Sequence, residues 1–305
     1  MQLTRYLPYR LRRRIETARH DRAISSVLAT PPLIPRDDGV VLFSMIGTAV
    51  LLPYLVAVKS LWRHLQRGRV VLLDDGSLTS RDKELLNLHC GNPEIISLDS
   101  VVTDPFPRGS CWERFLTILD RRKDEYWIQL DSDTVTLADV PEVRAAVEGN
   151  RSFTMLSGDD GEIGALPLRE IASALYPDGP ADGHIQVRIE SRMGQIGRDD
   201  WRYIRGCAGF AGFSAQGAGR PLAAEFLDAM KRLVGSDVVT WGTEQVASNF
   251  QVANDAEPVL LPARRYLNFW NEGWHGDTAF LHFVGSHRYD SGAYARVSRE
   301  VIASL

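Results

Sequence analysis

The stretch YWIQLDSDTVTL, residues 126–137, decides the fold that this sequence predicts. Its apolar part, 126–130, reads as a buried strand with polar segments before and after it. Asp131 and Asp133 follow directly, with one serine between them. In an open α/β sheet such residues face the crevice beyond the carboxyl ends of the strands, where ligands bind. Because neighbouring carboxylates repel each other unless a cation or a proton lies between them, the pair indicates a divalent metal site.

Strand and helix patterns alternate on the amino-terminal side of this stretch. Apolar runs read as strands over three segments: 40–45, 69–77 and 94–99. Apolar residues at helical spacing occupy 51–66, where Gly68 is expected to end the helix, and 111–122. Thr79 and Asp82 form a capping-box pattern that opens another helix. This β-α-β order predicts an α/β fold with a Rossmann-like, mostly parallel sheet flanked by helices.

Past residue 150 the alternation loosens. Two runs, 153–158 and 206–214, read as strands, and three have helical spacing: 168–176, 220–234 and 243–250. The polar, glycine-punctuated segment 179–200 is expected to be a mobile loop over a site. We expect a single domain over 39–305, with a nucleotide-side half (39–150) and a substrate-side half (151–305).

Residues 1–38 form a basic N-terminal arm in our interpretation. The first 22 residues hold seven arginines against two acidic residues, with tyrosine, leucine and isoleucine interleaved. No apolar segment with a cleavage site is present, which argues against a secretory signal. A basic amphipathic helix can lie on an anionic membrane surface. The alternative, which we favour, is a solvated helix packed on the domain or on a partner subunit.

Composition narrows the functional classes. The chain is 44% hydrophobic and 24% charged with a net charge of −4, which argues against nucleic acid as a partner. The longest apolar run, 49–58, is about half of a membrane span. The three cysteines have no zinc-like spacing, and their odd number predicts a reducing compartment. We therefore expect a soluble, cytoplasmic protein, with peripheral membrane contact only through the arm.

Two more stretches carry candidate ligand groups. In LLDDGS (72–77), an aspartate at a strand end can accept hydrogen bonds from a base or a ribose, or the stretch is an ordinary strand-to-helix turn. In FLHFVGSHRY (280–289), Gly285 and Arg288 follow His282 closely, which favours a ligand-binding turn over a core strand. One imidazole and two carboxylates suit Mn²⁺, with Mg²⁺ as a substitute. Arg288 can then grip a phosphate beside the metal.

Together these motifs resemble the GT-A glycosyltransferases, most closely the glycogenin-like and lipopolysaccharide-galactosyltransferase family. In that family a D-x-D motif and a distant C-terminal histidine hold Mn²⁺ on the pyrophosphate of a nucleotide-sugar. The histidine opens the motif H-x-x-G-x-x-K-P-W. This chain has His282 and Gly285 at the matching positions, Arg288 in place of the lysine, and no Pro-Trp.

The order of further motifs extends the resemblance over roughly residues 40–290. GCAGFAGF (206–213) resembles the family's N-A-G strand, with Cys207 in place of the asparagine. WGTEQVASNF (241–250) resembles its D-Q-D-x-x-N segment, with Glu244 and Gln245 at the Asp-Gln positions and Asn249 at the asparagine. Arg114 matches an arginine that contacts the donor.

The resemblance implies a metal-dependent hexosyltransferase. The donor would be a nucleoside-diphosphate sugar, with UDP favoured, and the acceptor a hydroxyl of a glycan or another molecule, with retention of configuration. The implied metal ligands are Asp131, Asp133 and His282, and Glu244 and Gln245 would face the sugar, Glu244 as an electrostatic stabiliser or as a base. The implied donor-binding residues are Ser44, Asp74, Asp75, Arg114, Asp131, Gly285 and Arg288.

Two other functions compete with this one. IQLDSDTV also fits the opening motif of the haloacid-dehalogenase-like phosphatases, with Asp131 as the nucleophile, and TMLSGDD (154–160) imitates their second acidic motif. Asp133 and Asp159 are only 26 residues apart, too few for the elements between those motifs, and about 90 residues of α/β pattern precede the first. The second rival is a non-catalytic homologue that binds nucleotide or glycan, which sugar-transfer turnover would separate from an enzyme.

Overall fold

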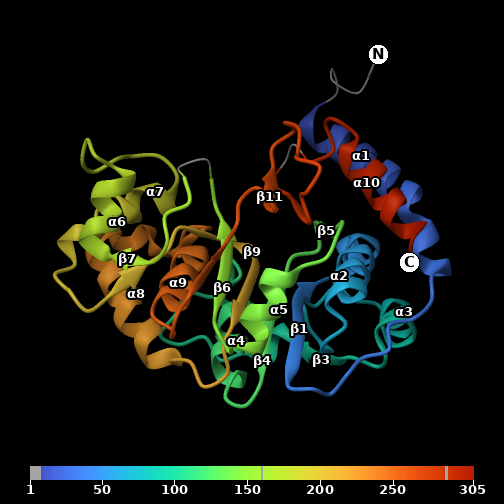
Figure 1. Cartoon of the computed structure of the whole chain (residues 1–305), viewed down its shortest axis with the longest axis horizontal. Helices are drawn as coiled ribbons and strands as arrows, with labels where there is room; N and C mark the ends of the chain where they lie inside the picture. Colours follow the sequence, from blue (N-terminus) through green and yellow to red (C-terminus); the bar gives the residue numbers. More distant parts are fainter. Residues whose placement is uncertain (1–7, 159–160, 286–287) are drawn as a thin grey trace.

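A mixed sheet forms the centre of the protein (Figure 1), as seen in a computed structural model that describes residues 8–158, 161–285 and 288–305. Within these residues the sheet has seven strands in the order β10-β6-β9-β4-β1-β2-β3. Their bounds are β1 Val40–Ile46, β2 Arg69–Asp74, β3 Glu94–Ser97, β4 Tyr126–Leu130, β6 Phe153–Leu156, β9 Gly206–Phe213 and β10 Val259–Leu261. Only β9 runs antiparallel to its neighbours, β4 and β6. The predicted α/β fold with a mostly parallel sheet is confirmed.

Helices cover both faces of this sheet. The α-helices are α1 Tyr9–Ile24, α2 Leu51–Leu65, α3 Ser80–Cys90, α4 Trp112–Arg121, α5 Pro141–Glu148, α6 Leu168–Leu175, α7 Ile185–Glu190, α8 Arg220–Val234, α9 Thr243–Ala253 and α10 Ala293–Ile302. Short 3-10 helices lie at Ser25–Ala29, Thr48–Val50, Leu98–Ser100, Met193–Gln195 and Gly235–Val239. Helices α2, α5 and α10 contribute to one buried hydrophobic cluster, and α4, α8 and α9 to the other.

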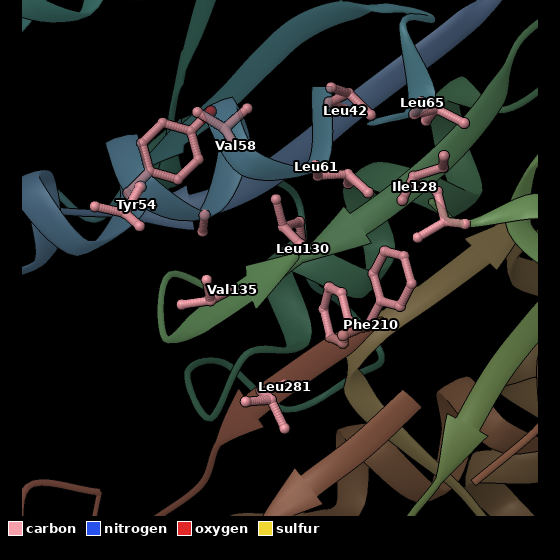
Figure 2. Packing of buried hydrophobic residues seen from close by; sticks show 14 of the residues in the cluster. Leu42, Tyr54, Val58, Leu61, Leu65, Ile128, Leu130, Val135, Phe210 and Leu281 are labelled. Carbon is pink, nitrogen blue, oxygen red and sulfur yellow. The ribbon is translucent and has the colours of Figure 1, made fainter. Parts of the chain in front are cut away.

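Strands β1 and β4 read as continuous apolar runs because they are buried on both faces. In β1, Leu42 belongs to the cluster of α2, and Phe43 belongs to the cluster of α4. The side chains of Leu61 and Leu65 on α2 lie over those of Leu42 and Ile128 (Figure 2). In β4, Ile128 and Leu130 belong to the cluster of α2 and Trp127 to that of α4, and the two aspartates follow where the strand ends.

A second sheet of three strands brings the C-terminal part of the chain to the end of β4. It has the order β11 (Tyr266–Phe269), β12 (Phe280–Phe283), β5 (Thr134–Thr136), and a short pair, β7 (Leu166–Pro167) and β8 (Arg202–Tyr203), lies apart from it. The register sets His282 opposite Asn268 on one side and Thr134 on the other. His282 therefore lies in a strand, and the expectation of a turn at this residue was wrong. The turn follows at Gly285, whose φ is +69°.

The predicted capping box opens α3, whereas α2 ends before the predicted Gly68. The capping box is present, since Thr79 N–H donates to Asp82 Oδ2 at 2.8 Å and Asp82 N–H donates to Thr79 Oγ1 at 3.2 Å. Helix α2 ends three residues before Gly68, because Gln66 takes a left-handed conformation and donates to the carbonyl of Trp62 at 2.7 Å.

The expectation of a mobile loop over 179–200 was wrong. This segment contains α7, whose Ile185 and Ile189 are fully buried with Met193 in the cluster of α8 and α9. Residues four apart lie on one face of a helix, so Ile185 and Ile189 share a face of α7, and Met193, which begins the next 3-10 helix, packs in the same cluster. Glycine and charged residues are more numerous than apolar ones in this segment of the sequence. The few apolar residues nevertheless pack against the domain, and their burial stabilises the helix.

The N-terminal arm packs on the domain over α1. This helix lies alongside α10 (Figure 1) and contacts α2 as well. His20 stacks on Tyr294 with ring centroids 4.0 Å apart, and Ile24 is fully buried. These contacts agree with the packed-helix alternative. Among the residues that the structure describes, no helix has both the length and the apolar character needed to cross a membrane.

The packing of α1 should weaken in acid because of His20. Burial and the charge of Arg288 lower the pKa of His20 from 6.5 to about 4. Between these values the unfolded chain binds a proton that the folded chain excludes, so the free energy of unfolding falls as pH falls, by about 3 kcal/mol at pH 4. His20→Phe keeps the stacked ring and cannot be protonated. Urea unfolding from pH 7 to pH 4 should show the variant losing less stability than the parent, and parallel losses would contradict the assignment.

A buried ion pair joins the segments that follow α4 and α9, and its loss should destabilise the fold. Arg122 Nη1 lies 2.5 Å from Asp255 Oδ2, and both side chains are 1% exposed. Asp255→Ala leaves the guanidinium buried without its partner, which typically costs about 3–5 kcal/mol. The matched control is Asp228→Ala, which removes an exposed partner of Lys231 and should change stability by less than about 1 kcal/mol. Equal losses of unfolding free energy in the two variants would contradict this assignment.

Candidate metal site

Three possible metal ligands converge where the two sheets meet. Asp131 and Asp133 follow β4, and His282 comes from β12. One ligand atom from each residue lies within 4.8 Å of the others, a clustering found once among the residues described. His282 Nε2 is 3.3 Å from Asp133 Oδ1 and 3.8 Å from Asp131 Oδ2. The sequence-predicted ligand set is therefore brought together.

Backbone hydrogen bonds hold the two aspartates in place. Asp131 N–H donates to the carbonyl of Gly209 on β9 at 2.8 Å, and Thr134 Oγ1 donates to the carbonyl of Asp131 at 2.9 Å. On the other side, Phe283 N–H donates to the carbonyl of Asp133 at 2.9 Å. Each aspartate is thus attached to a different sheet, and the distance between their carboxylates depends on how the sheets meet.

Two arginines compensate the charge of the carboxylates. Arg114 on α4 bonds Asp131 through Nη1, and its Nη2 lies 3.3 Å from Glu244 Oε1 on α9. Arg288 Nη1 lies 2.6 Å from Asp133 Oδ2, and Arg288 Nε donates to the carbonyl of Gly285 at 2.8 Å. Four of the predicted site residues, Arg114, Glu244, Gly285 and Arg288, therefore lie around the three ligands.

The same contacts shift the pKa values of the buried groups. Burial alone would raise the pKa of Asp133, but the charges of His282 and Arg288 outweigh it and lower the pKa. Burial alone would lower the pKa of His282, but Asp133 and Cys207 outweigh it and hold the pKa well above 6.5. Without a metal, a proton on Nε2 and the two arginines therefore balance the carboxylates.

The donor set fits a hard divalent cation. Two carboxylates and an imidazole are ligands that Mn²⁺ accepts, and Mg²⁺ with them if water completes the shell. Adjacent ligands of an octahedral ion at about 2.1 Å lie about 3.0 Å apart, close to the 3.3 Å between His282 Nε2 and Asp133 Oδ1. Arg288 occupies the other oxygen of Asp133, which leaves Oδ1 facing the centre of the cluster.

Glu244 and Gln245 lie beside the cluster at the start of α9. Burial, opposed by Arg114 and reinforced by Asp131, raises the pKa of Glu244 to about 7. Gln245 Oε1 accepts a hydrogen bond from Ala208 N–H at 3.2 Å, and its Nε2 donates to Gln186 Oε1 at 2.7 Å. The carboxyl group of Glu244 is thus held by Arg114, and the amide of Gln245 is held by β9 and α7.

The other predicted donor residues lie at the ends of β1 and β2, each with contacts of its own. Ser44 is buried and donates to the carbonyl of Leu130 at 2.7 Å. Asp74 is buried and pairs with Lys83 at 2.9 Å. Asp75 is exposed, and its Oδ1 accepts hydrogen bonds from Ser77 N–H at 2.9 Å and Ser77 Oγ at 2.6 Å. Of these three, only Asp75 is exposed to solvent.

Two residues of the site escaped the sequence analysis. Asn268 on β11 lies with its Oδ1 2.8 Å from His282 Nδ1. Gly209 on β9 leaves the space that the imidazole fills, since a Cβ there would lie 2.3 Å from His282 Cε1. A polar residue inside the apolar run YLNFW (266–270) was a usable signal for Asn268. Gly209 gave none, because its neighbour across the sheets is 73 residues away.

Gly209→Ala should displace His282 and weaken metal binding. A Cβ this close to a ring forces the imidazole to move, and the movement separates Nε2 from the two carboxylates. Gly212→Ala is the matched control: on the same strand, its Cβ would lie 2.3 Å from Phe153 Cε1, in the core. Both variants should lose thermal stability through overpacking. Only Gly209→Ala should lower Mn²⁺ affinity in calorimetric titration, by about tenfold or more; equal affinities would show that the glycine does not position the histidine.

Comparison with known proteins finds similarity in structure alone, as no protein-family model and no curated protein matches the chain. The apo bifunctional glycosyltransferase WbbM matches 83% of this chain at 16% identity and a TM-score of 0.49, and this chain spans 47% of WbbM, about half its length. The galactosyltransferase LgtC, solved with donor and acceptor sugar analogues, matches 87% at 14% identity and a TM-score of 0.46, over 96% of LgtC. GlyE of Streptococcus pneumoniae TIGR4 matches 87% at 14% identity and 0.47, over 62% of GlyE. The chain is thus similar in structure to glycosyltransferases, the class that its motifs resemble.

Proposed function

We propose that this protein is a metal-dependent glycosyltransferase that moves a sugar from a nucleoside-diphosphate sugar to an acceptor hydroxyl. One observation carries the proposal: the D-x-D aspartates after β4 and His282 of β12, far apart in sequence, form one cluster of ligand atoms within 4.8 Å. Ligands of this type suit Mn²⁺ or Mg²⁺. Such an ion, when bound, supplies a Lewis acid for the departing diphosphate.

Arg288 is the proposed phosphate-binding residue. It follows β12, reaches Asp133 with Nη1 at 2.6 Å, and keeps 22% of its side chain exposed. Charge on a departing diphosphate is stabilised by fixed positive groups close to it. Arg114, with 7% of its side chain exposed, is bound to both Asp131 and Glu244. Its proposed role is to hold these two carboxyl groups apart and in place beside the donor.

The proposed reaction exchanges one bond at the anomeric carbon. The bond from that carbon to the diphosphate oxygen breaks, its electron pair leaves with the diphosphate, and the acceptor oxygen forms the new bond. The acceptor proton must leave as well, and a carboxyl group with a pKa near 7 is suited to take it. Glu244, whose pKa is about 7, is the proposed group on the sugar side, with Gln245 next to it. Retention of configuration stays a prediction from the family resemblance.

Asp75 is the proposed contact for the base or ribose. It is exposed at the end of β2, beside Gly47 at the end of β1, where an added Cβ would lie 2.2 Å from its carboxylate. Asp74 and Ser44 would support the backbone there through Lys83 and Leu130. A UDP-sugar is the proposed donor, on the resemblance alone, and a glycan or another hydroxyl compound the proposed acceptor.

The cellular setting is part of the proposal. All three cysteines are free, which suits a reducing compartment and hence the cytoplasm. Peripheral membrane contact through the basic arm stays a prediction, since α1 packs on α10.

Calorimetric titration with UDP, GDP and CMP, each with Mn²⁺ and again with EDTA, tests the proposal. One nucleotide should bind with micromolar affinity, about −8 kcal/mol, and only with the metal. Asp133→Ala and His282→Ala should abolish this binding because each removes a ligand. Asp228→Ala, on the exposed face of α8, is the matched control and should bind as the parent does.

The other outcomes identify the rival functions. Unchanged nucleotide binding in both ligand variants would overturn the three-ligand site. Metal binding without nucleotide binding, together with phosphate release that depends on Asp131, would favour the phosphatase. The second acidic motif of that rival, Asp159 and Asp160, lies outside the described residues. Nucleotide binding without turnover of any UDP- or GDP-sugar would favour the non-catalytic homologue.

A further inference from the structure

We propose that Asn268 orients His282 for the metal by accepting its Nδ1–H, so that Nε2 is the nitrogen that faces the ion. The inference rests on the proposed metal site and names a positioning residue within it. A metal-binding histidine needs its other ring nitrogen fixed by a hydrogen bond, because that bond sets both the tautomer and the plane of the ring.

The register of the second sheet places the two residues side by side. Strands β11 and β12 are parallel, and Asn268 pairs directly with His282. Both are almost fully buried, at 8% and 5% exposure. Asn268 Oδ1 lies 2.8 Å from His282 Nδ1, the usual length of a full hydrogen bond. The contact is therefore built into the pairing of two strands and needs no loop to hold it.

A second hydrogen bond decides which way the amide of Asn268 points. Its Nδ2 donates to the carbonyl of Leu156, at the end of β6, at 2.7 Å. A carbonyl can only accept, so the NH₂ group faces Leu156 and the oxygen faces the imidazole. An amide oxygen also can only accept, so His282 Nδ1 must carry a hydrogen. The central sheet thus determines, through one amide, the proton on Nδ1.

Protonation of Nδ1 leaves the other ring nitrogen, Nε2, free to bind a cation. With Nδ1 protonated, the lone pair available to a cation is that of Nε2, which lies 3.3 Å from Asp133 Oδ1 and 3.8 Å from Asp131 Oδ2. Gly209 leaves room for the ring on one side. The ring cannot turn over without breaking the bond to Asn268, so Nε2 keeps its place beside the carboxylates.

Cys207 is the other neighbour of Nδ1, and the distances show which of the two residues, Asn268 or Cys207, is the closer partner. Its Sγ lies 3.5 Å from Nδ1, against 2.8 Å for the amide oxygen. Sulfur is a weak acceptor, so the amide is the principal partner. An amide is also neutral, and it orients the imidazole without adding a third negative charge to two carboxylates.

Mn²⁺ titration of four proteins tests the assignment: the parent, Asn268→Leu, Asn268→Asp and Cys207→Ala. The leucine is close to asparagine in size but removes the acceptor, and Mn²⁺ affinity should fall by about 10- to 100-fold. The aspartate loses the donor to Leu156 but keeps an acceptor oxygen toward Nδ1, so its Mn²⁺ affinity should stay at least about threefold above that of the leucine variant. The cysteine variant removes only the weaker neighbour and should stay within about threefold of the parent. Thermal unfolding of each protein reports on the fold.

Each outcome decides a specific question. Equal affinity of the parent and Asn268→Leu would overturn the inference. An equal loss in the leucine and aspartate variants would overturn it too, since a purely structural role does not distinguish an acceptor from an apolar group. Should the leucine variant fail to fold, Asn268→Ser, whose hydroxyl is too short to reach Nδ1, serves in its place. Absence of Mn²⁺ binding in the parent would instead overturn the proposed metal site itself.

Discussion

The structure of the site depends on one electrostatic constraint: Asp131 and Asp133 cannot lie this close without positive charge between or beside them. The fold supplies that charge from both sides. Arg114 reaches Asp131 from α4 on one face of the central sheet, while His282 and Arg288 reach Asp133 from β12 and the turn after it. The ion pairs of these two aspartates therefore join α4 to β12, elements more than 140 residues apart in sequence. This explains why the site forms where the two sheets meet.

Close packing also holds the residues of the metal site in position. The antiparallel strand β9 lies next to β4, and its Gly209 both accepts a hydrogen bond from Asp131 and leaves space for the ring of His282. The core beside the site is closely packed: Phe210, the next residue on β9, stacks on Phe280 of β12 with ring centroids 4.2 Å apart. Figure 2 shows Phe210 and Leu281 as members of this buried cluster. A protein interior this dense resists small displacements, so the ligand atoms are held where the backbone places them.

The local parts of this structure could be predicted from the sequence, and the parts that depend on distant pairing could not. Continuous apolar runs identified β1, β2 and β4, and the Thr79–Asp82 capping box identified the start of α3, because each of these signals lies within a few residues. The D-x-D pair and His282 were found through motifs. The strand around His282, its pairing with Asn268 and the contact between Arg114 and Glu244 depend on which segments meet in space. Helix α7 was missed for a related reason, since its buried apolar residues, Ile185 and Ile189, indicate a helix only once a partner surface exists.

Under the proposed function, the balance of charge in the site links the affinity for the metal to the affinity for the nucleotide. Without an ion, the two carboxylates are offset by Arg114, Arg288 and a proton on His282, whose pKa is well above 6.5. A dication that takes the place of that proton adds positive charge to a cluster that was already close to neutral. Of the two arginines, Arg288 is the more accessible to a bound phosphate, since 22% of its side chain is exposed against 7% for Arg114. In the proposed donor complex, an anionic diphosphate would offset the charge of both the ion and Arg288. Metal and nucleotide should then favour each other's binding by the same factor, as linkage requires. Under the proposed function, this arrangement of charges predicts a donor site that needs both the metal and the nucleotide.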